Sequence, residues 1–128
     1  MRTLAIAGLF ALAALAAQAE GISGIFQTQA NDNGDIGMVQ FDRCGERYCG
    51  TLVKSFRADG TAFKSENEGR NIVWDMVDDG DGRFSGGKIW DPGSNKTYAS
   101  KMSLSGKTLK VSGCVSVICR SQTWTRVK

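Results

Sequence analysis

The sequence predicts an all-β protein folded as one closed antiparallel barrel. No segment of residues 20–128 repeats its apolar side chains at the 3.6-residue period of an amphipathic helix. Short runs of alternating apolar and polar residues dominate instead, and clusters of Gly, Asn, Asp and Ser separate them. Eight such runs in one short chain are expected to close on themselves, because closure removes the unpaired edges of a sheet.

The eight predicted strands are joined mostly by hairpins. Their ranges are 23–29, 37–42, 49–57, 71–77, 83–90, 97–104, 108–114 and 119–127. Turn-forming clusters follow the first, fourth and fifth of them, at residues 31–35, 78–82 and 91–95, and Ser105-Gly106-Lys107 forms a tight turn after the sixth. Residues 58–70 are polar and irregular, with room for a helical turn. Consecutive hairpins predict an up-and-down meander, and an eight-stranded barrel can be filled by side chains or hold one small ligand.

The first 19 residues have the pattern of a cleaved secretory signal peptide. Arg2 provides a positive charge, residues 4–17 are an apolar run, and Ala17-Gln18-Ala19 is a cleavage site of small residues. The run is too short for a stable membrane span. We therefore expect a periplasmic or secreted protein whose single domain covers residues 20–128.

The four cysteines occur as two pairs with the same spacing. Cys44 and Cys49 enclose four residues, as do Cys114 and Cys119. A four-residue loop between antiparallel strands places the flanking residues opposite each other, close to the separation that a disulfide requires. An exported chain meets an oxidising compartment, which favours disulfides over the alternative of a four-cysteine zinc site. We predict local Cys44–Cys49 and Cys114–Cys119 bonds.

The composition argues against several classes of function. The sequence contains no histidine, which removes Ser-His-Asp and Cys-His catalysis and the usual histidine zinc sites. The net charge is +3, and the basic residues are scattered singly without interleaved aromatics, so no nucleic-acid partner is expected. Carboxylates are present, yet their spacing singles out no acid–base pair. We expect no enzyme activity, no cofactor and no catalytic residue.

Two acidic clusters resemble metal-binding loops without meeting their requirements. An EF-hand places oxygen ligands at positions 1, 3 and 5 and glycine at position 6. The cluster of Asp75, Asp78, Asp79 and Asp81 offers no such frame, and residues 31–35 place Ile36 where glycine is required. Hairpin turns explain both clusters, so no metal site is expected.

Aromatic and sulfur-containing side chains of the central strands are the candidate ligand-binding residues. By strand parity, Trp74 shares a face with Met76, and Trp90 shares a face with Phe84. Ligand pockets are mostly apolar with a few placed polar groups. The alternative is that these side chains only pack the core. The candidate set for the wall of a pocket is Trp74, Met76, Phe84, Trp90 and Tyr98.

Several segments resemble the bacterial DUF2147 family. They are residues 86–92 (GGKIWDP), 96–98 (KTY), 109–114 (LKVSGC) and 119–126 (CRSQTWTR), together with Cys44-Gly45 and Cys49-Gly50. The resemblance is specific in the last forty residues and loose between Phe56 and Arg83. It implies a small exported protein with a lipocalin-like (calycin) barrel, which agrees with the meander. The family name assigns no function.

The resemblance also implies how the barrel closes. Calycins tend to open their first strand with Gly-x-Trp, and that tryptophan packs against a basic residue near the end of the last strand. This chain has Gly24-Ile25-Phe26 at that position, with Trp124 and Arg126 in the last strand. A cation–π contact from Arg126 to Phe26 would be weaker than one to tryptophan, at about 0.5–1 kcal/mol.

Two functions of different classes fit these observations. The first is an exported protein that binds a small apolar or amphipathic ligand inside the barrel, which rests on analogy between folds. The second is a cell-envelope module that contacts a protein partner through its loops and has no small-molecule ligand.

Overall fold

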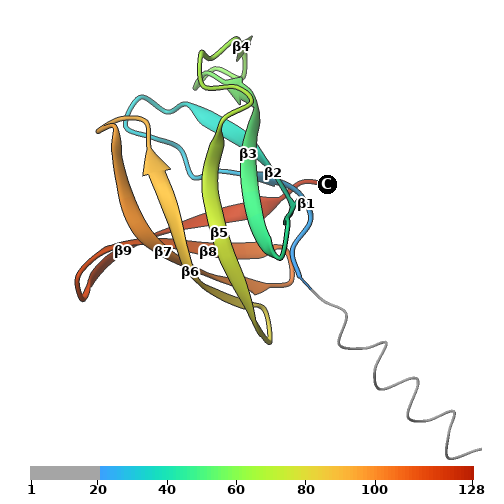
Figure 1. Cartoon of the computed structure of the whole chain (residues 1–128). Helices are drawn as coiled ribbons and strands as arrows, with labels where there is room; N and C mark the ends of the chain where they lie inside the picture. The colour runs from blue at the N-terminus through green and yellow to red at the C-terminus, as the bar shows by residue number, and fades with distance from the viewer. Residues whose placement is uncertain (1–20) are drawn as a thin grey trace, which may run out of the picture.

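The computed structural model describes residues 21–128, and its ribbon is a β-barrel with connecting turns and loops (Figure 1). The predicted signal peptide at residues 1–19 lies outside the described residues. Within the described part no segment is helical, and none forms a helix long and apolar enough to cross a membrane. The all-β prediction is confirmed.

Residues 21–128 form nine strands, which follow one another in sequence order. They are β1 (Gly24–Gln27), β2 (Ile36–Cys44), β3 (Arg47–Phe56), β4 (Ala62–Phe63), β5 (Asn71–Gly80), β6 (Arg83–Asp91), β7 (Lys96–Ser105), β8 (Thr108–Val115) and β9 (Ile118–Arg126). Eight of them match the predicted strands, and most are longer than predicted because each hairpin continues pairing up to its turn. The ninth, β4, lies in the segment predicted to be irregular, which contains this short strand and turns in place of the expected helical turn.

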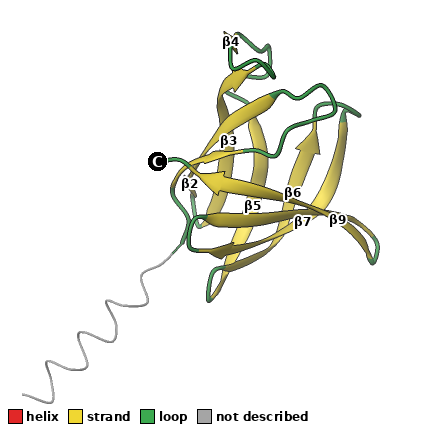
Figure 2. Ribbon diagram, turned by 180° about the vertical axis from the view of Figure 1, so that it is seen from behind, coloured by secondary structure: helices red, strands yellow, loops and turns green. Residues whose placement is uncertain are grey.

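Eight of the strands form a closed antiparallel barrel (Figure 2). The sheet order is β2-β1-β9-β8-β7-β6-β5-β3-β4, and an additional pairing of β2 with β3 closes the ring. Strand β4 pairs only with the end of β3, through Ser55–Phe63 and Phe56–Ala62, and extends above the barrel. The predicted eight-stranded up-and-down barrel is confirmed, with β4 as an addition to it.

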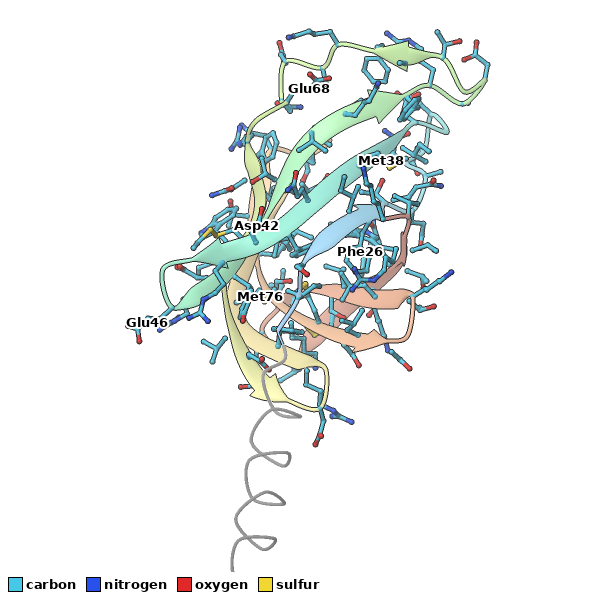
Figure 3. All side chains as sticks on the ribbon, turned by 90° about the vertical axis from the view of Figure 1, so that its right-hand side faces the viewer. Phe26, Met38, Asp42, Glu46, Glu68 and Met76 are labelled. Carbon is cyan, nitrogen blue, oxygen red and sulfur yellow. A yellow bond between two sulfur atoms is a disulfide. The ribbon has the colours of Figure 1, made fainter. Side chains whose placement is uncertain are left out.

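The strand directions give the barrel two different ends. The turn end carries the tight turns at residues 45–46, 81–82 and 106–107. The loop end carries the connections at residues 28–35, 57–70, 92–95 and 116–117. In Figure 3 the long β2–β3 hairpin runs from Glu46 at the turn end toward Met38 near the loop end.

The interior is filled by aromatic and aliphatic side chains. The Phe26 and Phe41 rings meet edge to face, with centroids 5.5 Å apart, and Trp124 lies 6.2 Å from Phe41. Tyr48 and Phe84 make a second edge-to-face pair at 5.8 Å. The largest fully buried side chains are Phe26, Phe41, Phe84, Met76, Leu109, Val39, Val73 and Val111. Much of the barrel therefore has a packed core.

Strands β1 and β9 form the shortest junction of the barrel wall. They pair only through Phe26–Arg126 and Gln27–Thr125, whereas β8 and β9 pair over their full length. Farther along, the side-chain oxygen Oε1 of Gln29 accepts a hydrogen bond from the Thr123 amide at 3.0 Å. A side chain thus replaces the main chain as the partner of β9 where β1 has ended.

Both predicted disulfides are present. Cys44–Cys49 closes the β2–β3 hairpin at the turn end, and Cys114–Cys119 closes the β8–β9 hairpin at the loop end. In each hairpin the two cysteines are separated by five positions. In β8–β9, Cys114 and Cys119 lie directly opposite each other in the strand register.

Removing either disulfide is expected to destabilise the barrel. The double variant Cys114→Ser/Cys119→Ser should lose about 2 kcal/mol of unfolding free energy, because the bond closes a short loop in the unfolded chain. Cys44→Ser/Cys49→Ser should lose more, since Cys49 is only 5% exposed and its serine replacement would bury a hydroxyl. Urea unfolding of both variants measures the difference. Stability equal to that of the unmodified protein in either variant would contradict the prediction.

Candidate functional site

The residues expected to close the barrel lie together at the turn end. The guanidinium carbon of Arg126 is 4.7 Å from the centre of the Phe26 ring, and the two residues are directly paired between β1 and β9. Nη1 of Arg126 donates a hydrogen bond of 2.8 Å to the Ser23 carbonyl. Arg126 therefore ties the entry of the first strand to the exit of the last.

Gly24 and Trp124 complete this group. A Cβ added at Gly24 would lie 2.5 Å from the Lys128 carbonyl oxygen and 2.6 Å from Nη1 of Arg126, so only glycine leaves room for the guanidinium. Trp124 is buried, and its Nε1 donates a hydrogen bond of 2.8 Å to Oε1 of Gln122. This arrangement is the one that the family resemblance implies for closure, with Phe26 in the place of tryptophan.

Met76 and Phe84, two of the candidate ligand-binding residues, lie in the packed core. Met76 is fully buried, and a Cβ added at Gly87 would lie 2.7 Å from its sulfur. Phe84 packs edge to face against Tyr48. Both side chains are surrounded by other residues of the protein, so they pack the core and do not line a pocket.

Two bulges place Trp74 and Trp90 on the outer face of the sheet. Asp75 has a positive φ of 60° between Trp74 and Met76, and Gly86 has a φ of 74° between Phe84 and Trp90. Each bulge changes the alternation of the strand. The prediction that Trp90 shares a face with Phe84 is therefore wrong, as is the prediction that Trp74 shares one with Met76.

Their neighbours on the outer face confirm these positions. Trp74 is half-buried and paired with exposed Lys88. Trp90 is paired with exposed Thr97, and its Nε1 donates a hydrogen bond of 3.0 Å to Oδ1 of Asn95. The Arg70 guanidinium carbon lies 3.3 Å from the centre of the Trp90 ring, which explains why an outer-face tryptophan is only 6% exposed.

Tyr98 is the one candidate that lies on the inner face near the loop end. It is paired with Ile89 of β6, and both side chains are half-buried. Gly113 of β8 lies beside them, because a Cβ added there would be 3.3 Å from Cγ2 of Ile89 and 3.4 Å from Cβ of Tyr98. Val73, paired with Ile89 on the other side, is fully buried. These four residues form an apolar row across β5 to β8.

Polar and charged groups continue this row on β9. The register places Arg120 opposite Gly113 and Gln122 opposite Val111, so both belong to the same face of the sheet as the row. Arg120 is exposed at the loop end. We refer to Ile89, Tyr98 and Gly113 of this apolar row, together with Arg120, as the inner row. Three of its four members were not predicted from the sequence, since the bulge at Gly86 changes the alternation of β6 before Ile89 and a glycine has no side chain to mark its face.

A shallow hollow lies elsewhere on the loop end. It measures about 400 Å³, is open to solvent, and is lined by Asn33, Asp35, Arg57, Ala58 and Asp59. Hydrogen bonds from the Thr61 side chain and amide hold the pKa of Asp59 below its ordinary value. The polar, open surface lacks the apolar walls of a ligand pocket.

The acidic clusters lie in turns only in part: residues 31–35 are in the β1–β2 connection, whereas Asp75, Asp78 and Asp79 belong to β5 and only Asp81 lies in the β5–β6 turn. Oδ1 of Asp78 accepts a hydrogen bond from the Gly80 amide at 2.8 Å, and Oδ2 of Asp79 accepts one from the Ser85 hydroxyl at 2.6 Å. Oδ1 of Asn31 likewise accepts from two amides of its loop. Among residues 21–128, no three cysteine or acidic side chains are grouped as metal ligands would be.

Comparison with known families identifies the family of this chain. The model of the DUF2147 family, described as an uncharacterized protein conserved in bacteria, matches residues 24–126. The chain belongs to the DUF2147 family. The match spans all eight barrel strands, so the family's conserved unit is the barrel itself. No curated protein matches the sequence.

A solved structure supports the fold of this DUF2147 member. Protein HP1028 from Helicobacter pylori, which is described as belonging to the lipocalin family, is similar with a TM-score of 0.68 at 18% sequence identity. The similarity covers 84% of each chain. At this identity it shows that the fold is lipocalin-like and does not transfer a ligand.

Proposed function

We propose that this DUF2147 protein is exported and binds a small amphipathic ligand at the loop end of its barrel. The observation that carries the proposal is the inner row. Ile89 and Tyr98 are half-buried on the inner face, whereas Phe84, farther along β6, and Val73, on β5, are buried in the core. An apolar wall that ends in polar groups is the usual composition of a ligand site.

Each part of the inner row has a role in this proposal. The Ile89 side chain and the Tyr98 ring contact the apolar part of the ligand. Gly113, where an added Cβ would lie 3.3 Å from Cγ2 of Ile89, lets the ligand approach the β8 backbone beside these two side chains. Arg120, on the same face and exposed at the rim, binds a carboxylate or phosphate head group through a charge-assisted hydrogen bond. Export is supported by the predicted signal peptide and by two disulfides, which persist in oxidising compartments.

Filling the space beside Gly113 tests this function. In Gly113→Leu, the added side chain would occupy the position of the ligand against Ile89 and Tyr98. We expect at least a ten-fold loss of affinity for a dansyl-labelled fatty acid, because each methylene excluded from an apolar contact costs about 0.8 kcal/mol. Fluorescence titration of protein expressed with its own leader measures the affinity.

The matched control adds the same side chain on the other face. Ala99→Leu is next to Tyr98 in β7 and exposed on the outer face, so it should leave the affinity unchanged. If Gly113→Leu fails to fold, Tyr98→Ala provides the same test by removing the wall. Unchanged affinity in a folded Gly113→Leu or Tyr98→Ala protein, or no binding of the fatty acid at all, would refute the proposed function.

A further inference from the structure

The tip of the β8–β9 hairpin exposes three aliphatic side chains. Val115, Val117 and Ile118 are 63%, 91% and 72% exposed, and elsewhere in the described chain only Val53 and Val127 are exposed large hydrophobics. The hairpin projects from the barrel body, at the lower left in Figure 1. Contiguous exposed apolar side chains on a small protein commonly mark an interaction site.

The tip is held in one conformation. The Cys114–Cys119 disulfide lies directly below it, and Val115 still pairs with Ile118. Ser116 completes the turn with a φ of 55°. Because the turn is already ordered, binding through it requires little loss of conformational entropy. This distinguishes the tip from an exposed loop whose apolar residues could fold back onto the barrel.

The part of the chain that carries the tip is strongly basic. No aspartate or glutamate occurs after Asp91, while residues 92–128 contain Lys96, Lys101, Lys107, Lys110, Arg120, Arg126 and Lys128. Residues 21–91, in contrast, contain twelve acidic and eight basic residues. The net charge of the whole chain is small because the acidic residues 21–91 offset the basic residues 92–128. The basic part contains strands β7, β8 and β9.

One basic residue is next to the tip, and two more lie on β7, the strand that pairs with β8. Arg120 follows Cys119 directly, Lys96 begins β7 at the same end of the barrel, and Lys101 is paired with Ser112 on the outer face of β8. Basic residues at the turn end of the barrel contribute little to binding at the tip, because salt screens charges over a distance of about 8 Å at physiological ionic strength. The tip thus combines exposed aliphatic side chains with flanking cations.

We propose that this hairpin tip docks the protein on an anionic lipid surface. Val115, Val117 and Ile118 insert into the interfacial region, and Arg120, Lys96 and Lys101 contact the phosphate groups around them. Binding to such an interface increases with the apolar area buried and with attraction to anionic lipid. A projecting tip fits a deformable lipid surface, and among residues 21–128 no aromatic side chain is exposed, which disfavours a nucleic acid. Arg120 also belongs to the inner row, so the electrostatic test below changes Lys96 and Lys101, which lie outside that row.

Vesicle binding tests the apolar part of the proposal. Protein exported with its own leader is mixed with vesicles of phosphatidylcholine alone or of phosphatidylcholine and phosphatidylglycerol in equal parts, and bound protein is measured by flotation. We expect binding to the anionic vesicles, and at least a ten-fold weaker partition for Val117→Asp/Ile118→Asp. The control Val53→Asp/Val127→Asp makes the same change in charge at two other exposed valines and should retain at least half of the binding.

Charge and salt test the electrostatic part. Lys96→Gln/Lys101→Gln should weaken binding to the anionic vesicles by roughly five-fold for each charge removed. High salt should weaken the binding of the unmodified protein in the same direction. Equal binding to both vesicle compositions, or equal binding of the tip variant and the unmodified protein, would overturn the proposal. The proposal would also be overturned if this protein captured an envelope protein through the tip and did not bind vesicles.

Discussion

Phe41→Ala is expected to lower the free energy of unfolding by about 3–5 kcal/mol, the usual cost of removing a buried phenylalanine. The Phe41 side chain is fully buried and lies between the Phe26 and Trp124 rings. It therefore joins β2 to both strands of the closing junction, β1 and β9. Its loss leaves a cavity where the core and the closure meet, and the remaining rings cannot fill it without moving the backbone.

Chemical unfolding monitored by tryptophan fluorescence measures this effect, since Trp124 reports on the same cluster. The matched control is Gln40→Ala, the exposed neighbour of Phe41 on the same strand, which should change stability by less than about 0.5 kcal/mol. A loss below 1 kcal/mol for Phe41→Ala would mean that the cluster does not stabilise the closure of the barrel, contrary to our interpretation.

Gly82→Ala is expected to destabilise the protein by about 2–5 kcal/mol. Gly82 has a φ of 77° in the β5–β6 turn, where a side chain is strained. An added Cβ would also collide with the Leu104 carbonyl oxygen, whose backbone is held in place by a 2.7 Å hydrogen bond from the Leu104 amide to the Gly82 carbonyl. The backbone strain and the steric clash add up at this position.

Gly106→Ala separates the two contributions. Gly106 has a φ of 60° in the neighbouring β7–β8 turn, and an added Cβ there would meet no atom within 4 Å. Its cost should be that of the backbone conformation alone, about 1–2 kcal/mol. Thermal unfolding of both variants gives the comparison, and a Gly106→Ala loss as large as that of Gly82→Ala would rule out the steric clash as a cause.

The fold was largely predictable because its determinants are local. Alternating runs, glycine- and asparagine-rich turns and two equally spaced cysteine pairs each specify a hairpin, and eight sequential hairpin strands lead to a closed barrel. The closure by Arg126 and Phe26 joins opposite ends of the chain, and only the family resemblance indicated it. Strand β4 was missed, since a two-residue strand has no periodicity to detect.

The candidate site was only partly predictable. Bulges at Asp75 and Gly86 change the alternation of β5 and β6, and a one-residue change exchanges the two faces of a strand. Counting alternate residues through these bulges led to the prediction that Trp74 shares a face with Met76 and that Trp90 shares a face with Phe84. Asp75 gives no warning of this, because aspartate adopts a positive φ only occasionally. The stacking of Arg70 on Trp90 joins residues of different strands, which a sequence pattern does not reveal.

The two-pair junction between β1 and β9 predicts where the native protein opens most readily. Local opening follows the elements with the fewest cross-strand interactions, and the most protected amides belong to the most extensively paired strands. In native-state hydrogen exchange, the β1 amides should therefore exchange through small openings at low denaturant. The β8 amides, paired along the full strand on both sides, should exchange only when the whole barrel unfolds. The strands of the barrel are therefore expected to open in a fixed order that begins with β1.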